Sequence, residues 1–149
     1  MTNIKEKNSV NVGVDVGKFQ LDIYIFEREK YFTVSNCKEG IREALKVFSR
    51  YTIERIVVEA TGRYETEFAT AAFDKDLPLC IVKPLLVRQF ARAADQLAKT
   101  DKIDAQLIAR FAAVMKPRFN QRQSKNLRLI KDLIARRRQL IEMRTQEMN

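Results

Sequence analysis

Histidine is absent from this 149-residue chain, and its absence removes several classes of enzyme site. Serine–histidine catalysis, cysteine–histidine catalysis and histidine-rich zinc sites are excluded, because each of them needs an imidazole. Cysteine occurs only at Cys37 and Cys80, which lack any metal-ligand spacing, so we interpret both as reduced structural thiols. A metal ion held by this chain must therefore bind oxygen ligands, which favours Mg²⁺ or Mn²⁺.

Long apolar runs and targeting segments are also lacking. No apolar run reaches the ~18 residues that are needed to span a bilayer. The polar start of the chain, residues 1–9, does not have the pattern of a signal peptide. We therefore expect a cytoplasmic protein with no membrane partner. Its hydrophobic content of 46% is ample for the core of one domain plus an appendage.

Positive charge is unevenly distributed along the chain. Residues 1–87 contain 13 basic and 13 acidic residues, whereas residues 88–149 contain 15 basic and 6 acidic residues and so account for the net charge of +9. A one-sided basic surface is typical of a protein that binds a polyanion. A solvated helix rich in arginine and lysine would have the same composition, so charge alone leaves both interpretations open.

Hydrophobic periodicity predicts an α/β fold. Three early strands with short connections predict an antiparallel meander, after which helices alternate with two further strands. Such an order predicts a mixed five-stranded sheet flanked by helices on both faces. We expect strands at residues 10–16, 20–26, 31–35, 55–58 and 79–82, and helices at residues 38–51, 64–76, 85–95 and 100–115.

The last part of the chain predicts a separate helix. A polar connector at residues 117–123 precedes a basic amphipathic helix at residues 124–149. Its apolar stripes have no evident partner in the preceding domain, which suggests a coiled coil or dimerisation element and hence a homo-oligomer. The helix stops in mid-pattern without a glycine cap, so we expect either a chain cut from a longer protein or packing against another copy.

Four acidic residues occupy the ends of predicted core elements. Asp15 lies in an apolar strand and Glu59 ends another, while Asp101 and Asp104 begin a helix. Residues three apart on a helix lie about 60° apart, and Asp104 falls within the apolar arc that faces the sheet. Buried carboxylates are costly unless a cation compensates them. If the two strands are neighbours, the four side chains can hold two divalent ions for phosphodiester chemistry.

Other interpretations of these residues remain open. An aspartate in a strand often sets a turn or register, a glutamate can simply end a strand, and Asp101 can serve as a helix cap or dipole partner. We interpret Asp22 as facing out of its strand and Asp95 as ending a helix, with neither in the site. Residues 12–17 resemble a dinucleotide-binding loop only weakly, because the full glycine pattern is missing.

Basic residues near the acids are candidates for nucleic-acid contacts. Arg63 lies in the segment Thr61-Gly-Arg-Tyr64 at a predicted helix start, where backbone amides can bind a phosphate. Ordinary capping by Thr61 explains that segment equally well. Lys99 and Lys102 flank the acidic pair and are either contacts to a nucleic-acid backbone or solvated lysines.

Three segments together resemble the signatures of the DEDD transposases, the one-ten group of bacterial insertion-sequence transposases related to the Piv/MooV DNA invertases. These segments are Asp15-Val-Gly-Lys18, Glu59-Ala-Thr-Gly62 and Lys99-Thr-Asp-Lys-Ile-Asp-Ala105, and Arg136-Arg-Arg-Gln-Leu140 resembles the segment that follows them in the family. The resemblance covers residues 10–149. It is specific because the segments occur together at this spacing.

The resemblance implies a RuvC-like, ribonuclease H-type catalytic domain at residues 8–116 and a DNA-recombining activity. It implies that Asp15, Glu59, Asp101 and Asp104 bind Mg²⁺. Lys18 and the run Arg136, Arg137 and Arg138 join the predicted nucleic-acid contacts. Family members carry a further C-terminal domain with a serine thought to act as nucleophile, and some use a structured guide RNA. We therefore expect this chain to be catalytically incomplete without that second domain.

Four functions are compatible with the sequence. The first is the metal-binding catalytic domain of a transposase or recombinase that acts on DNA. The second is a stand-alone RuvC-like nuclease for Holliday junctions, and the third is one lobe of an actin-like sugar kinase, although the chain is short for that fold and has no adenosine loop. The fourth is a non-catalytic module for nucleic-acid binding and dimerisation, which the basic helix at residues 124–149 favours.

Overall fold

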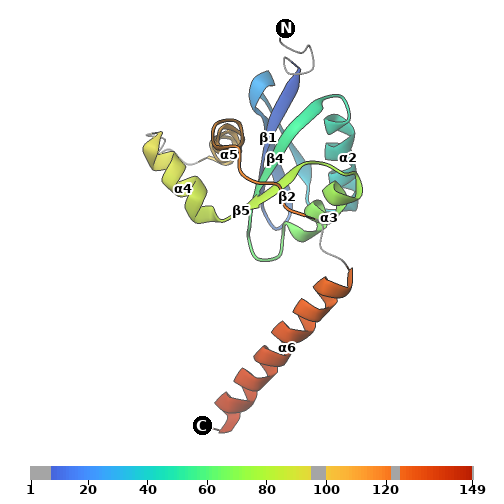
Figure 1. The fold of residues 1–149 in the computed structure, drawn as a ribbon, viewed down its shortest axis with the longest axis vertical. Helices are drawn as coiled ribbons and strands as arrows, with labels where there is room; N and C mark the ends of the chain where they lie inside the picture. Colours follow the sequence, from blue (N-terminus) through green and yellow to red (C-terminus); the bar gives the residue numbers. More distant parts are fainter. Residues whose placement is uncertain (1–7, 95–99, 122–124, 149) are drawn as a thin grey trace.

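Five strands form one mixed sheet at the centre of the protein (Figure 1). The computed structural model describes residues 8–94, 100–121 and 125–148, except for the side chains of Asp101 and of residues 125–128. The strand order is β3-β2-β1-β4-β5. β1 pairs antiparallel with β2 and parallel with β4, while β2–β3 is antiparallel and β4–β5 is parallel. The strands are β1 (Ser9–Val16), β2 (Gln20–Ile25), β3 (Lys30–Ser35), β4 (Thr52–Glu59) and β5 (Leu79–Val82).

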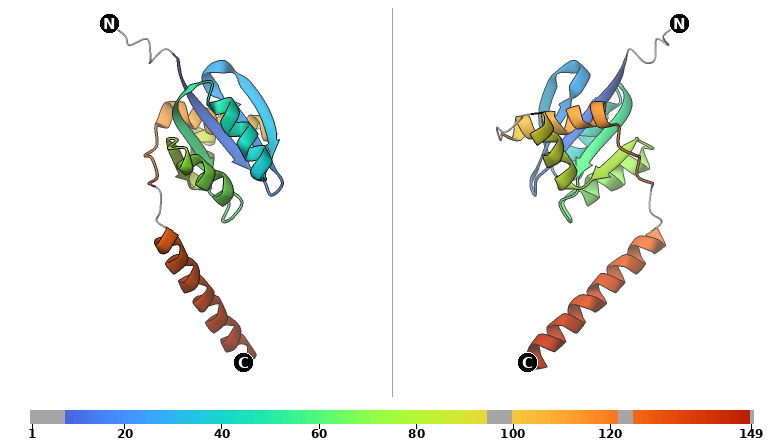
Figure 2. Two further views of the ribbon diagram at one scale, coloured as in Figure 1. Left: turned by 90° about the vertical axis from the view of Figure 1, so that its right-hand side faces the viewer. Right: turned by 60° about the vertical axis from the view of Figure 1, so that its left-hand side comes forward.

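Helices cover both faces of the sheet. Figure 2 shows α2 and α3 over one face in its left view, and α4 and α5 over the opposite face in its right view. This architecture confirms the predicted α/β class and agrees with a ribonuclease H-like fold. The helices are α2 (Lys38–Phe48), α3 (Thr66–Asp74), α4 (Pro84–Ala93), α5 (Asp101–Met115) and α6 (Lys125–Met148), and a 3₁₀ turn, η1 (Phe26–Arg28), joins β2 to β3.

Alternation along β1 explains why its two faces have different neighbours. Val10, Val12 and Val14 are fully buried in the cluster that includes residues of α2 and α3. Asn11, Gly13 and Asp15 fall on the other face, because successive side chains of a strand point to opposite sides. On that face β1 presents two polar residues and a glycine, and the apolar contacts of the sheet there come instead from Val57 of β4 and Cys80 and Val82 of β5.

The face under α4 and α5 has its own apolar cluster. Val57 of β4 packs with Ile108 and Phe111 of α5 and with Val87 of α4. Phe90 of α4 contacts Phe111 edge to face, with ring centroids 5.6 Å apart. Edge-to-face aromatic pairs of this kind add to the free energy gained by burial. The cluster therefore fixes α5 against β4 as well as against β1.

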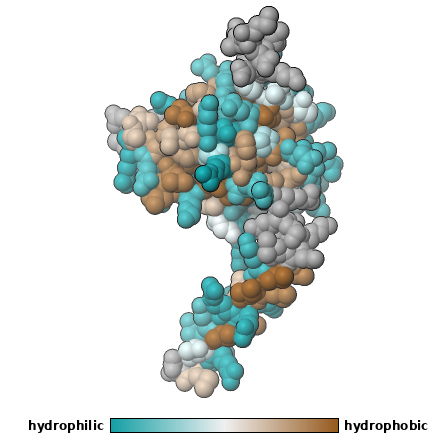
Figure 3. Space-filling model, in the orientation of Figure 1, coloured by the Kyte–Doolittle hydropathy of each residue, from teal (hydrophilic) through white to brown (hydrophobic). Residues whose placement is uncertain are grey.

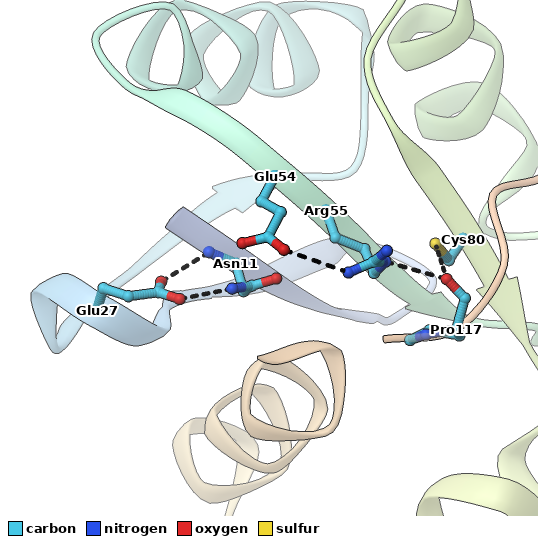
Figure 4. A network of polar contacts seen from close by, with 6 residues as sticks. All are labelled: Asn11, Glu27, Glu54, Arg55, Cys80 and Pro117. Atoms are coloured by element: carbon cyan, nitrogen blue, oxygen red, sulfur yellow. Dashed lines mark hydrogen bonds and ion pairs between the residues drawn. The ribbon is translucent and has the colours of Figure 1, made fainter. Parts of the chain in front are cut away.

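The connector that follows α5 is anchored to β4 and β5. The side chain of Arg55, on β4, donates a hydrogen bond to the carbonyl of Pro117 at 3.0 Å (Figure 4). It also lies 4.7 Å from the Phe119 ring centroid. Asn120 donates its amide to the carbonyl of Leu79 at 2.8 Å. The domain bounds predicted at residues 116 and 117 stay predictions, but contacts with the sheet continue to Asn120.

Helix α6 lies apart from the sheet and its helices (Figure 1). Every side chain described from Leu129 to Met148 is exposed. Figure 3 shows apolar and polar surface side by side along this helix. Among the helices of the described residues, none is long and apolar enough to cross a membrane.

Several element bounds differ from the expectation by one to three residues, for example at the end of α2, which is Phe48 rather than residue 51. Two of these differences have a clear physical reason. β4 begins at Thr52 rather than at residue 55, because Thr52 pairs with Ser9 at the start of the parallel β1–β4 ladder. α3 begins at Thr66 rather than at residue 64, because residues 61–65 form a turn that is closed by side-chain hydrogen bonds.

Candidate metal centre

Asp15 and Glu59 lie side by side at the ends of two neighbouring parallel strands. Val14 of β1 stands opposite Val58 of β4, so the next residues, Asp15 and Glu59, occupy the same level of the sheet. Residues at one level of a parallel pair point to the same face. This is the face covered by α5, because Gly13, two residues before Asp15, contacts that helix. The condition that the two strands be neighbours is therefore met.

A close contact between β1 and α5 brings Asp104 to the same place. A Cβ atom at Gly13 would lie 2.2 Å from the backbone nitrogen of Ala109 and 2.5 Å from the backbone oxygen of Ala105. Only a residue without a Cβ atom allows the helix backbone to approach this closely. Asp104 directly precedes Ala105, so the contact sets the first turn of α5 beside the end of β1.

Thr100 supplies the cap of α5. Its side-chain oxygen accepts a hydrogen bond from the Ile103 amide at 3.2 Å, and its carbonyl accepts from the Asp104 amide at 2.8 Å. The capping side chain is therefore that of Thr100, rather than that of Asp101 as one interpretation of the sequence proposed. The side chain of Asp101, a predicted metal ligand, lies outside the described residues.

The pKa of Glu59 depends on Asp15 and Asp104, the other predicted ligands whose side chains are described. Burial, together with the negative charges of Asp15 and Asp104, raises the pKa of Glu59 to about 7, while Arg88 on α4 acts in the opposite direction. Desolvation and like charges both disfavour the ionised form of a carboxyl group. Three of the four predicted acids thus share one electrostatic environment, and Arg88 is a neighbour that the sequence did not indicate.

The carboxylates form an oxygen-rich site rather than a closed cage. Among the side chains that the structure describes, no three acidic or cysteine side chains are gathered closely enough to hold a metal ion. The donors that Asp15, Glu59 and Asp104 offer are all carboxylate oxygens, a donor set that suits Mg²⁺ or Mn²⁺.

Asp22 is a further acidic residue on this face, contrary to the interpretation that it points out of its strand. The antiparallel register places Asp22 directly opposite Asp15, and only 6% of Asp22 is exposed. Its carboxylate accepts hydrogen bonds from the Tyr31 hydroxyl at 2.6 Å and from the Gln20 amide at 3.2 Å. Alternation in β2 does separate Asp22 from the apolar face, but α5 covers the face to which it turns.

The predicted nucleic-acid contacts lie on exposed positions around and beyond this site. Lys18 and Arg63 follow the ends of β1 and β4, and Lys102 lies in the first turn of α5 with its ammonium 6.0 Å from the Tyr31 ring centroid. Lys99 lies outside the described residues. Arg136, Arg137 and Arg138 are exposed on α6, far along the chain from the sheet. The described basic residues thus lie on two separate surfaces, one beside the acidic residues and one on α6.

Hydrogen bonds among its own residues close the turn after β4, at residues 61–65. The Glu65 carboxylate accepts from the Thr61 amide at 3.1 Å and from the Thr61 hydroxyl, while the Tyr64 amide donates to the Thr61 hydroxyl at 3.2 Å. Burial raises the pKa of Glu65, but hydrogen bonds from Thr61 and from nearby amides outweigh it and lower the pKa. These hydrogen bonds close the turn, but Thr61 does not cap α3, whose N-cap position is Glu65 and has no side-chain cap hydrogen bond. Phosphate binding by the amides of this turn stays a prediction.

Comparisons with known proteins agree with the sequence and the fold. The sequence model of the DEDD transposases of the one-ten group, described as a transposase family, matches residues 12–149. The pilin gene-inverting proteins of Moraxella bovis and Moraxella lacunata are each 29% identical over 146 residues, covering 91% of this chain. The chain spans 45% of the length of each of these relatives. Because the family match extends over nearly all of the sequence, the chain belongs to the DEDD transposase family.

Proposed function

We propose that this chain is the metal-binding catalytic part of a DNA transposase or recombinase. The observation that carries the proposal is the shared environment of Asp15, Glu59 and Asp104, in which the pKa of Glu59 rises to about 7. Paired strand ends and a helix start that converge in this way suit divalent-metal phosphoryl chemistry. The family supports DNA as the substrate.

Each acidic residue has a specific role in the proposal. Asp15, Glu59, Asp101 and Asp104 would hold Mg²⁺ or Mn²⁺ through carboxylate oxygens. The bound ion would stabilise negative charge on a phosphate of the DNA backbone. Asp22 does not need to touch the metal, because its hydrogen bond with Tyr31 holds it on β2, in the position opposite Asp15. Lys18, Arg63 and Lys102 would contact phosphates on either side of the reacting one.

Metal binding by the purified chain tests this proposal directly. Isothermal titration with Mn²⁺ at pH 8, where Glu59 is mostly ionised, should give a saturable signal for the unmodified chain. Asp104→Asn should abolish that signal and leave the circular dichroism spectrum unchanged. Glu67→Gln, an exposed acid on α3, is the matched control and should bind as the unmodified chain does. Equal Mn²⁺ binding by the Asp104→Asn variant would contradict the proposal.

A stand-alone junction nuclease is the second candidate. In favour of this candidate, all four predicted metal ligands lie in β1, in β4 or in the first turn of α5, and none lies in α6. Cleavage of a branched DNA by the 149-residue chain with Mg²⁺ would support this alternative. The transposase proposal instead expects this chain to bind metal without completing strand cleavage or exchange, because the family resemblance implies a serine outside it.

We also propose that α6 joins two copies of the protein. Its apolar residues lie in stripes on an otherwise basic helix and are more than half exposed, notably Leu129, Leu133, Ile134, Leu140 and Ile141. Sedimentation velocity should show self-association that Leu133→Lys removes.

Arg136, Arg137 and Arg138 of α6 would hold nucleic acid. A competition between duplex DNA and a structured RNA would decide whether a guide RNA binds there.

A further inference from the structure

Two exposed aromatic side chains mark the sheet edge that carries the acidic residues. Phe19 lies in the turn after β1 and is 77% exposed, and Tyr64 lies in the loop after β4 and is 45% exposed. Single exposed apolar residues are common on protein surfaces and need no explanation by themselves. The way in which these two are held in place is what distinguishes them.

Asn36 ties both aromatic residues to one point of the backbone. Its amide donates to the carbonyl of Phe19 at 2.8 Å. Its side-chain nitrogen donates to the carbonyl of Gly17 at 2.9 Å and to the carbonyl of Tyr64 at 3.0 Å. The turn after β1 and the loop after β4 are therefore joined through a single residue, which brings the backbones of Phe19 and Tyr64 close together.

The scaffold behind Asn36 is rigid. Gly40 in α2 packs so closely on the preceding strand that a Cβ atom there would lie 1.9 Å from the carbonyl oxygen of Ser35. On the other side, the Tyr64 amide donates to the Thr61 hydroxyl at 3.2 Å. Both aromatic positions thus rest on hydrogen-bonded turns, and a stacking partner would lose little conformational entropy in the protein on binding.

The charges next to the aromatic rings indicate what kind of partner fits. The Lys18 ammonium lies 5.1 Å from the Phe19 ring centroid, and Arg63 is exposed directly before Tyr64. An aromatic ring beside a cation suits a nucleotide, because the ring stacks on the base while the cation attracts its phosphate. Two such rings offer far less apolar area than a stable protein interface needs.

We propose that Phe19 and Tyr64 form a stacking surface for unpaired nucleobases beside the acidic site. Bases within a duplex are stacked on one another, so only an unpaired or flipped base offers its face to an aromatic ring. Asp15 lies two residues before Gly17, and Glu59 lies five residues before Tyr64. A base held on this surface would position its own backbone phosphate near the carboxylates. This inference rests on the proposed function, since it assigns a nucleic-acid subsite to the same centre.

Fluorescence of 2-aminopurine in a single-stranded oligonucleotide tests the stacking surface. The probe is quenched when it stacks on an aromatic ring, and EDTA in the buffer makes the result independent of the metal site. We expect the unmodified chain to quench the probe and to bind this strand more tightly than a duplex of the same sequence. Phe19→Ala and Tyr64→Ala should each weaken binding by about tenfold, as is typical for the loss of one base–aromatic stack.

Conservative and distant variants separate stacking from other roles. Tyr64→Phe keeps the ring and should restore both quenching and affinity. Leu86→Ala removes an equally exposed side chain from α4 (46% against 45% for Tyr64) and should change affinity by less than about twofold. Circular dichroism of each variant should match the unmodified chain, because both aromatic side chains are exposed.

Three results would overturn the inference. Binding and quenching that persist in both alanine variants would place the strand elsewhere, while the Mn²⁺ titration would still support the metal centre. No association of the chain with the single strand would also contradict the stacking surface, and the same titration would show whether the proposed function fails with it. Loss of self-association in Phe19→Ala, without any change in quenching, would identify a protein contact instead.

Discussion

The sheet domain (residues 8–121) and helix α6 use apolar side chains in opposite ways. In the sheet domain Val12, Val14 and Ile23 are completely buried, and helices cover both faces of the sheet. In α6 Leu133 and Ile134 are each more than half exposed. The sheet domain buries its own apolar side chains, whereas α6 exposes apolar side chains to solvent. A domain can thus bury its own core while the helix attached to it keeps its apolar stripes exposed.

Charge divides the chain at a different place. Residues 1–87 have equal numbers of basic and acidic residues, and the excess positive charge is shared between the end of the sheet domain and α6, with 7 basic and 3 acidic residues in 88–121 and 8 basic and 3 acidic residues in 122–149. A single 24-residue helix gains little from tertiary packing, so its stability depends on intrinsic propensity and on whatever covers its apolar stripes. Substitutions in the sheet domain should therefore change the free energy of unfolding far more than substitutions in α6.

The largest effect should come from filling the contact between β1 and α5. Gly13→Val places side-chain atoms where the backbone of Ala105 and Ala109 already lies, and should lower the free energy of unfolding by about 3 kcal/mol or more. Urea denaturation followed by circular dichroism measures the change. Ala135→Val on exposed α6 is the matched control and should cost only about 0.5 kcal/mol. Similar losses from both substitutions would contradict the comparison.

A smaller, pH-dependent effect should come from Glu59→Gln. Because the pKa of Glu59 is raised to about 7, the folded chain holds this proton more tightly than the unfolded chain does. The contribution to stability is present at pH 4 and falls as pH rises through the folded pKa. It amounts to on the order of 2 kcal/mol once solvent screening of this half-buried carboxyl group is allowed for. Glu59→Gln should therefore be more stable than the unmodified chain at pH 8 but not at pH 4, as thermal unfolding at both pH values will show.

Removing the anchor of the connector should have an intermediate effect confined to the boundary of the domain. Arg55→Ala loses the hydrogen bond to Pro117 and the contact with Phe119, and should cost about 1–3 kcal/mol. It should also expose residues 117–121 to limited proteolysis. Arg50→Ala, at an exposed position after α2, should leave both the stability and the cleavage pattern unchanged. Protection that persists in Arg55→Ala would mean that other contacts hold the connector.

The smallest effect on the sheet domain should come from the apolar stripe of α6. Leu133→Lys should change the urea midpoint of the sheet domain by less than about 0.5 kcal/mol, because Leu133 contributes nothing to its core. The same substitution should abolish self-association in sedimentation velocity, whereas Lys131→Gln should not. A large loss of sheet stability in Leu133→Lys would show that the two regions fold as one unit.

Periodicity was enough to predict the class of fold and the order of its elements. Alternation in β1 and helical spacing in α5 reflect burial on defined faces, which a sequence records directly. The turn between β1 and β2 was also predictable from the sequence, but the prediction that Asp22 faces out of its strand was wrong. Alternation shows which residues share a face, but it does not show that a later helix, α5, will cover that face.

The site depended more on contacts distant in sequence. The proximity of Asp15 and Glu59 follows from a parallel register that no local pattern specifies, and Asp104 joins them through the approach of α5 to Gly13. Arg88 and Arg55 gave no signal in the sequence, since each acts through neighbours that only the tertiary fold supplies. The positions of the acids in the sequence singled them out as candidates, whereas the fold was needed to place Asp15, Glu59 and Asp104 near one another, and their role as metal ligands stays a prediction.

Anomalous diffraction from crystals soaked in Mn²⁺ is the most direct test of the proposal that Asp15, Glu59, Asp101 and Asp104 together hold a divalent cation. We expect anomalous density between the ends of β1 and β4 and the first turn of α5. Density only at another place would contradict the proposed metal site. So would crystals in which the carboxylates lie close together without density between them.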